Sequence, residues 1–307
     1  MSLFLSILFQ ITLPIVVIAG LGFVLQRWLK FDVATLNRFV VYVILPSFLT
    51  YYLSSATIPL SAVATTAWFT VFQFFILVIV GIAASRVLRL EAGSHAVVAL
   101  AAGFPNSGNY GLPLVQLAFG PDFVLHQAVI VSLHSILITS VGVTLISHQR
   151  RGLADSLRAA FRTPVIPAVA AGIMLKLLHV KLPTPIGLPL QTLGTAYTPV
   201  ALFALGAQLA TSRWRAISLP LGLALGLRLV AAPMLTWLAV TLLHIQHPVA
   251  DLLVIISSVP VGVLLAVISM EYETSSDLAS AIVFMSTILS PITVTMFIFM
   301  TRTFGGS

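Results

Sequence analysis

The sequence predicts an all-α polytopic membrane protein, and its composition and long apolar runs carry this prediction. Of the 307 residues, 59% are apolar and 7% are charged, whereas an average soluble domain has about 25% charged residues. Apolar runs of the roughly 20 residues that a helix needs to cross a bilayer recur along the whole chain. Cysteine is absent, so disulfides and thiolate metal sites are excluded. No metal or other cofactor is expected.

Ten apolar stretches are expected to be membrane-spanning helices. Sequence alone places the ends of such helices to within about two to four residues. The ten expected spans, in order, are Phe4–Gln26, Leu36–Leu53, Ala62–Leu88, His95–Phe119, Phe123–Ser147, Pro164–Leu178, Ile186–Ala210, Ala216–Leu243, Leu252–Met270 and Leu278–Met300.

Lys and Arg gather in alternate loops of this arrangement. The first, third, fifth and seventh loops carry 11 of them, whereas the sixth loop carries Lys176 and Lys181. Because cytoplasmic loops are enriched in Lys and Arg, the odd loops are expected in the cytoplasm and both termini on the extracytoplasmic side. Topology then explains the net charge of +7, so membrane lipids are expected partners and nucleic acid is not.

The fifth loop, residues 149–163, is the longest and the most basic, and it divides the chain in two. Residues 1–148 would hold helices one to five, and residues 164–307 would hold helices six to ten. Large apolar residues recur every four positions within the loop, as in an amphipathic helix on a membrane surface. A plain cytoplasmic linker is the favoured interpretation, and a hinge or lipid sensor is the alternative.

The two halves are expected to form an inverted repeat. An odd number of spans in each half forces the halves into opposite orientations. Pro14 and Pro46 are 32 residues apart, as are Pro167 and Pro199. Inverted repeats of this kind are common in secondary transporters.

The fourth and ninth expected helices are interrupted near their middles. Residues 103–120 contain Pro105, a second proline and several glycines, and the ninth helix contains Pro260 followed by Gly262. Proline and glycine are poor helix formers, and irregular backbone within a membrane is tolerated only where it faces protein or water. We therefore expect two crossed, broken helices at the place where transporters commonly hold their substrate.

Polar residues gather at both interruptions. Asn106 and Asn109 are three residues apart and would share a face if the local turn is helical. Neutral amides and half-helix N-termini can bind a small anion at a lower desolvation cost than a buried Lys or Arg. Packing between helices is the alternative role for such residues. The predicted substrate-binding residues are Asn106, Asn109, Ser107 and Ser258, and the predicted crossover residues are Pro105, Pro260, Gly108 and Gly262.

Arg228 is the basic residue that lies well inside an expected span. An intramembrane charge costs at least about 2.5 to 3.5 kcal/mol, so it is a functional candidate. Arg228 could attract the anion, or it could brace backbone carbonyls or extend to the interface. His126 and His134 are interpreted as structural histidines in preference to a proton relay.

Several classes of protein are disfavoured by what the sequence lacks. No Asp or Glu lies deep inside an expected span, which disfavours a cation antiporter built on buried carboxylates. No nucleotide-binding fingerprint and no HExxH spacing occurs, which disfavours an ATP-driven pump and a metalloprotease. An enzyme is therefore not expected.

The motifs resemble those of the auxin efflux carrier family, which includes plant PIN-formed carriers and bacterial malonate and malate permeases. Phe-Pro-Asn-Ser at 104–107 and Gly-Leu-Pro-Leu at 111–114 are similar to the family's fourth-helix signature. Pro-Val-Gly at 260–262 and Ser-Pro-Ile-Thr at 290–293 resemble the end of the family sequence, and Arg228 also matches. The similarity covers nearly the whole chain.

The resemblance implies a ten-helix inverted repeat of the bile-acid-symporter type. It implies a scaffold of helices one, two, six and seven, and a transport domain of the other six that moves as an elevator with an organic anion. It also implies a homodimer. Asn106 stands at the family's substrate-binding asparagine, and Pro105 and Pro260 stand at the crossover. The short fifth loop is similar to that of bacterial members, so a bacterial inner membrane is expected.

The expected function is a secondary carrier for a small organic acid anion. One alternative is an organic anion symporter coupled to sodium or protons. Plant members of the family have an acidic and a basic residue in the third helix, whereas this chain has no acid there before Glu91. The other alternative is an anion channel that uses the same crossover.

Overall fold

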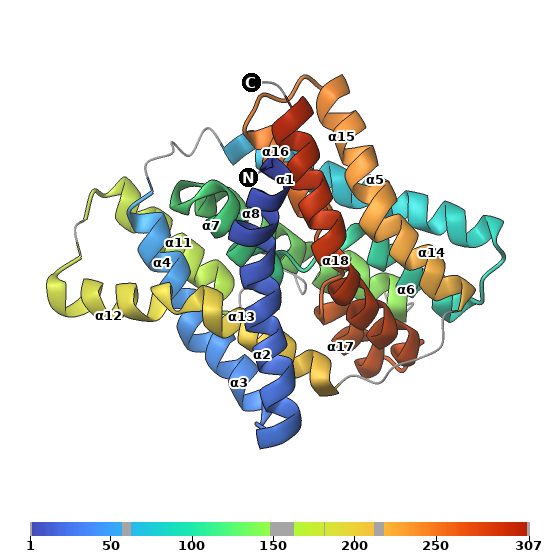
Figure 1. Cartoon of the computed structure of the whole chain (residues 1–307), viewed down its shortest axis with the longest axis horizontal. Helices are drawn as coiled ribbons and strands as arrows, with labels where there is room; N and C mark the ends of the chain where they lie inside the picture. Colours follow the sequence, from blue (N-terminus) through green and yellow to red (C-terminus); the bar gives the residue numbers. More distant parts are fainter. Residues whose placement is uncertain (1, 57–62, 148–162, 181, 212–217, 306–307) are drawn as a thin grey trace.

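The computed structural model of the protein describes residues 2–56, 63–147, 163–180, 182–211 and 218–305, which form helices joined by turns with no β-strand among them. Within these ranges, seven helical segments are long and apolar enough to cross a membrane. They are Leu3–Leu29, Val33–Ser54, Ala64–Val87, Pro121–Ser147, Thr184–Thr211, Leu219–Leu242 and Ser276–Phe304. The prediction of an all-α polytopic membrane protein is confirmed (Figure 1).

The seven long segments contain the following elements in chain order. They are α1 (Leu3–Ile7), η1 (Leu8–Thr12) and α2 (Leu13–Leu29); α3 (Val33–Phe39), η2 (Val40–Ile44) and α4 (Leu45–Ser54); α5 (Ala64–Val87); η5 (Pro121–Phe123), α8 (Val124–Leu137), η6 (Ile138–Gly142) and α9 (Val143–Ser147); α12 (Thr184–Thr195) and α13 (Tyr197–Thr211); α14 (Leu219–Gly226), η7 (Leu227–Ala231) and α15 (Ala232–Leu242); and α18 (Ser276–Phe304).

The other three expected spans contain no single helix long enough to cross a membrane. The expected fourth span consists of α6 (Ala92–Gly103), η4 (Ser107–Gly111) and α7 (Leu112–Phe119), the ninth of α16 (Val249–Ser257) and α17 (Leu264–Glu271), and the sixth is α11 (Val165–Leu177). A 13-residue helix such as α11 is about 20 Å long, whereas the hydrocarbon core is about 30 Å thick. Helix length therefore supports seven crossings, and ten crossings stay a prediction. The fifth loop, over residues 149–162, lies outside the described residues.

Four prolines each follow a π-helical turn. Pro14, Pro46, Pro113 and Pro233 lie in the first turn of α2, α4, α7 and α15, directly after η1, η2, η4 and η7. A proline inside a continuous α-helix would clash with the carbonyl four residues earlier, and a wider π turn relieves that clash. Pro14 and Pro46, which indicated the repeat in the sequence, therefore modify their helices without ending them.

Helices α2 and α13 cross at very close range near the centre of the molecule (Figure 1). A Cβ atom built on Gly22 would collide with the carbonyl oxygen of Phe203, and one built on Gly206 would collide with the carbonyl oxygen of Ala19. Glycine at both positions lets the two backbones touch, as small residues do between membrane helices. Helices α11 and α12 pack against α4 at one side of this pair.

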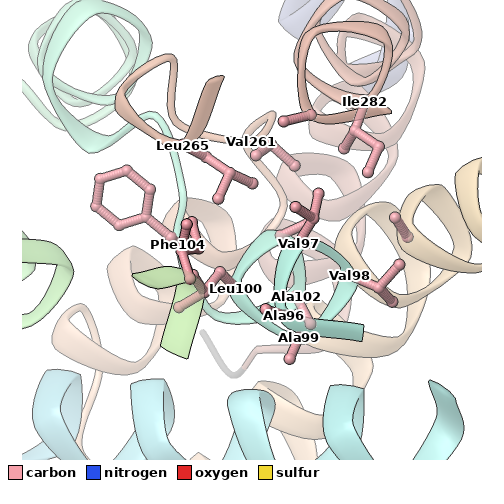
Figure 2. Close-up of a cluster of buried hydrophobic side chains, with 14 of the residues drawn as sticks. Ala96, Val97, Val98, Ala99, Leu100, Ala102, Phe104, Val261, Leu265 and Ile282 are labelled. Carbon is pink, nitrogen blue, oxygen red and sulfur yellow. The ribbon is translucent and has the colours of Figure 1, made fainter. Parts of the chain in front are cut away.

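Helix α6 lies inside a second packed group with α5, α14, α17 and α18. All residues from 96 to 103 are buried, which is the pattern of a helix surrounded by protein on every side. Figure 2 shows Val97 and Leu100 of α6 beside Val261, Leu265 and Ile282 from the second half of the chain. This group holds both interrupted helices in place.

We expect Gly22→Ala and Gly206→Ala to lower the free energy of unfolding by about 1–3 kcal/mol each, because an added methyl group has no space and forces the backbones apart. Thermal melting of the purified protein in detergent measures the change. Gly20→Ala is the matched control, since its Cβ would meet nothing within 4 Å. Equal melting temperatures for all three variants would contradict the close crossing.

Candidate functional site

The two interruptions lie side by side and exchange backbone hydrogen bonds. Pro105 and Val261 form an isolated antiparallel bridge. The backbone N–H of Asn106 donates to the Pro260 carbonyl at 2.8 Å, and that of Gly262 donates to the Phe104 carbonyl at 3.0 Å. Each break thus satisfies backbone groups of the other, which a membrane interior requires because water is not available there.

A side chain supports the second break from a neighbouring helix. The backbone N–H of Val261 donates to the hydroxyl oxygen of Ser286 on α18 at 3.1 Å, and that hydroxyl donates to the Val283 carbonyl at 3.1 Å. An unpaired buried N–H would cost about 1–3 kcal/mol. Ser286 therefore fixes the position of the strand-like segment after Pro260.

The two predicted crossover glycines differ in their surroundings. A Cβ atom on Gly262 would lie 3.0 Å from the carbonyl oxygen of Pro105 and against the ring of Phe104. Only glycine permits this approach of the two chains. A Cβ atom on Gly108 would meet nothing within 4 Å, so packing does not require glycine at that position.

Asn106 is buried at the crossing, with 6% of its surface exposed. It lies before η4 with backbone angles outside the helical region, φ −75° and ψ 64°, so the condition under which Asn106 and Asn109 would share one helical face is not met. The side-chain amide nitrogen of Asn106 is buried and has no hydrogen-bond partner among the described residues. Such an orphaned donor is rare in proteins and calls for a specific explanation.

The remaining predicted binding residues occupy different environments. Asn109 is half-buried within η4, and Ser107 is buried beside Asn106. The hydroxyl of Ser107 lies 3.3 Å from Nδ1 of His134. Ser258 is fully buried, but its hydroxyl donates to the Ile255 carbonyl of its own helix at 2.7 Å. Asn106 and Ser107 therefore form the polar centre of the crossing, and Ser258 supports the end of α16.

Helix α8 contributes a residue that the sequence analysis did not single out. Nε2 of Gln127 donates to the Ser107 carbonyl at 2.6 Å, and its Oε1 is buried with no hydrogen-bond partner in the described part of the chain. Together with the free amide donor of Asn106, this provides an acceptor and a donor at one site. The available signal in the sequence was a glutamine in the middle of an apolar span.

The two histidines of α8 have separate partners. Nδ1 of His126 lies 2.7 Å from the hydroxyl of Thr66 on α5, whereas His134 contacts Ser107 at the crossing. The Phe104 ring meets the His134 ring edge to face at 6.0 Å. These separate contacts fit structural histidines better than a relay that passes protons between them.

Arg228 binds the backbone of both interrupted helices. Its guanidinium donates to the carbonyls of Val259 at 2.9 Å, Ala102 at 3.1 Å and Ile256 at 3.2 Å, and 1% of the residue is exposed. Of the roles considered for Arg228, the structure shows the bracing of backbone carbonyls. Gln73 likewise joins helices, because its Nε2 donates to the Thr236 hydroxyl at 2.5 Å.

Two pockets flank the crossing on the side that faces α13. One, of about 290 Å³, is apolar and is lined by Ile15 and Ala19 of α2, Leu205 of α13, Tyr110 of η4 and Thr287 of α18, among others. The other, of about 260 Å³, lies between α13, α17 and α18. In the described part of the chain, no group of three or more His, Asp or Glu side chains could hold a metal ion.

Comparison with known proteins identifies the family. A family model described as "Membrane transport protein" matches residues 7–298. A protein of Rhizobium meliloti named "Putative malonate transporter" is 27% identical over 280 residues, which cover 87% of this chain and 86% of the relative. A Methanothermobacter thermautotrophicus protein named "Uncharacterized transporter" is 29% identical over 290 residues, covering 92% and 94%. The resemblance found in the motifs is confirmed, and the chain belongs to the membrane transport protein family of the auxin efflux carriers, whose members are transporters and not enzymes.

Proposed function

We propose that the protein is a secondary carrier that moves a small carboxylate across a bacterial inner membrane. The observation that carries this proposal is the buried amide donor of Asn106, which has no recorded partner and lies at the crossing of the two interrupted helices. A ligand oxygen would satisfy this donor and remove the cost of its burial, about 1–3 kcal/mol.

The backbone at the crossing favours a negative charge. The η4–α7 segment begins at Ser107 directly after the first break, and α17 begins at Leu264 directly after the second. The N-terminus of a helix carries partial positive charge and free N–H groups, so it attracts carboxylates. Asn109, in the first turn of η4, would add a further amide to the site, whereas the hydroxyl of Ser258 is bound to its own helix.

A relative supports the choice of a carboxylate. The Rhizobium meliloti protein named "Putative malonate transporter" aligns with 87% of this chain. Malonate, a dicarboxylate with a single carbon between its two acid groups, is therefore the first ligand to test. Small mono- and dicarboxylates of similar size complete the set.

The packing of the helices supports an elevator movement. The pair α2–α13 and the contacts of α11 and α12 with α4 would form the scaffold of helices one, two, six and seven, while α5, α6, α14, α17 and α18 share another core. Ten crossings in an inverted repeat, with residues 1–148 and 164–307 as its halves, are consistent with this grouping. The exposed apolar side chains of the scaffold, among them Trp28 and Tyr42, would meet lipid or a second subunit of a homodimer.

The burial of the polar centre favours a carrier over a channel. Asn106 and Ser107 are 6% and 4% exposed, so an ion at this site would lie under packed side chains. A carrier exposes such a site by moving one body against the other, on the microsecond-to-millisecond scale or slower. A channel would need a continuous open path through the same residues.

We expect Asn106→Ala to abolish binding and transport of the carboxylate, because it removes the amide donor at the crossing while its small side chain still fits. Uptake of radiolabelled malonate and related carboxylates into proteoliposomes measures the effect. Asn37→Ala, which changes an asparagine of α3 far from the crossing in sequence, is the control and should transport normally. Full transport by Asn106→Ala with normal membrane insertion would refute the assigned role.

A thermal-shift screen of mono- and dicarboxylates should identify the substrate. A ligand that binds the folded state alone stabilises it by about 2.7 kcal/mol at one hundred times its Kd. We expect malonate or a similar acid to raise the melting temperature of the wild type and to leave that of Asn106→Ala unchanged. If no carboxylate shifts the wild type, the proposed substrate class is wrong.

A further inference from the structure

Arg228 is the only Lys, Arg, Asp or Glu whose side chain is buried in the described part of the chain. It lies in the π turn η7, and its guanidinium reaches away from its own helix to the two interruptions. Its three carbonyl acceptors lie at or just past the C-terminal ends of α6 and α16. Ala102 is in the last turn of α6, Ile256 is in the last turn of α16, and Val259 is the second residue after α16.

A positive charge stabilises the C-terminal ends of α6 and α16. The last carbonyls of a helix lack partners within the helix and carry partial negative charge. Two such ends meet at Arg228, inside a membrane protein where water does not satisfy them. The guanidinium suits this place because it is always charged and presents five donors in a fixed plane. Lys has the charge but lacks the planar fork.

No carboxylate among the described residues is paired with Arg228. The chain has 8 acidic residues, and those in its described part lie at helix ends or in the turns between helices. One of these acids, Asp251, forms an ion pair with His247. In the described part of the chain, the full positive charge of Arg228 at the crossing thus faces the partial negative charges of backbone carbonyls.

We propose that Arg228 is the resident counter-charge of the carried anion as well as the residue that positions both half-helix ends. This inference rests on the proposed function, since it requires that the crossing moves with its ligand. Arg228 does not touch the anion, because its donors bind the C-terminal ends whereas the anion binds beside Asn106 at the N-terminal ends. It acts through the backbone and through its charge.

The proposal determines which step of transport responds to the membrane potential. With a bound monocarboxylate, the +1 charge of Arg228 and the −1 charge of the anion sum to zero, so the loaded crossing moves without net charge. With a bound dicarboxylate, which carries −2, the net charge of the loaded crossing is −1. The empty crossing carries only the +1 charge of Arg228 when it returns. Moving one elementary charge through the full potential changes an equilibrium by up to about 50-fold per 100 mV. When one anion is exchanged for another across the membrane, the crossing moves only in its loaded state. Exchange therefore measures the loaded step without the return of the empty crossing.

The test compares malonate with its monomethyl ester, which has the same carbon skeleton and one negative charge fewer. The full-length protein is reconstituted into liposomes with a set potassium diffusion potential, and the exchange of each radiolabelled anion is measured across 100 mV. For the wild type we expect exchange of the ester to change less than twofold and exchange of malonate to depend clearly on potential. Arg228→Lys keeps the charge, so it should preserve this difference while raising KM.

Arg228→Met removes the charge and should make exchange of the ester depend on potential, and exchange of malonate depend on it more steeply than in the wild type. The matched control is Arg302→Met, which removes an exposed arginine that also donates to a carbonyl, that of Ala118 at 3.1 Å. This control should behave as the wild type. A merely structural arginine would change the amount of folded protein but not the response to potential.

The outcomes separate the two proposals. If the wild type exchanges neither anion, the proposed function is wrong for carboxylates of this kind. The proposed role of Arg228 is then wrong as well, because it depends on that function. If the wild type exchanges both anions with the same dependence on potential, the counter-charge alone is refuted. The same holds if Arg228→Met exchanges malonate with unchanged steepness. If Arg228→Met fails to fold, the comparison of the two anions in the wild type and in Arg228→Lys still tests the counter-charge.

Discussion

The structure depends on one constraint, the need to satisfy backbone polar groups where two helices are broken inside the membrane. The N–H groups of Asn106 and Gly262 pair with carbonyls of the opposite break, and Ser286 accepts from Val261. Arg228 supplies donors for three further carbonyls. Because no solvent competes at this depth, each of these bonds is needed for the breaks to exist.

Some buried side-chain atoms near these backbone contacts have no hydrogen-bond partner in the described part of the chain. The amide nitrogen of Asn106 and the side-chain oxygen of Gln127 are buried and have no recorded partners. Both lie beside Ser107, whose carbonyl already accepts from Gln127. Buried side-chain atoms of Gln26, Tyr110, Tyr197 and Ser269 also lack a partner among the described residues. The unsatisfied atoms of Asn106 and Gln127 differ from these because they occur together beside Ser107, which indicates where a ligand or water is required.

Two kinds of packing surround the crossing and suit different mechanical roles. Gly22 and Gly206 bring α2 and α13 into backbone contact, which makes a rigid pair. Hydrogen bonds of neutral side chains join other helices, such as Thr295 of α18 with Thr12 of η1 at 2.7 Å and Thr198 of α13 with Gln116 of α7 at 2.6 Å. Single neutral hydrogen bonds contribute about 0.5–1.5 kcal/mol each, so the proposed elevator movement would break them more easily than the close backbone packing of α2 against α13.

The sequence by itself determined the membrane class, the family and the positions of both breaks, because hydropathy and the placement of proline and glycine are local properties. It also located Asn106 and Arg228. Only the tertiary structure decided what these residues do, since partners such as Pro260 for Asn106, or Ala102 for Arg228, are far away in the chain. The contact of Gln127 with Ser107 and the open space at Gly108 likewise depend on which helices become neighbours, which local pattern does not encode.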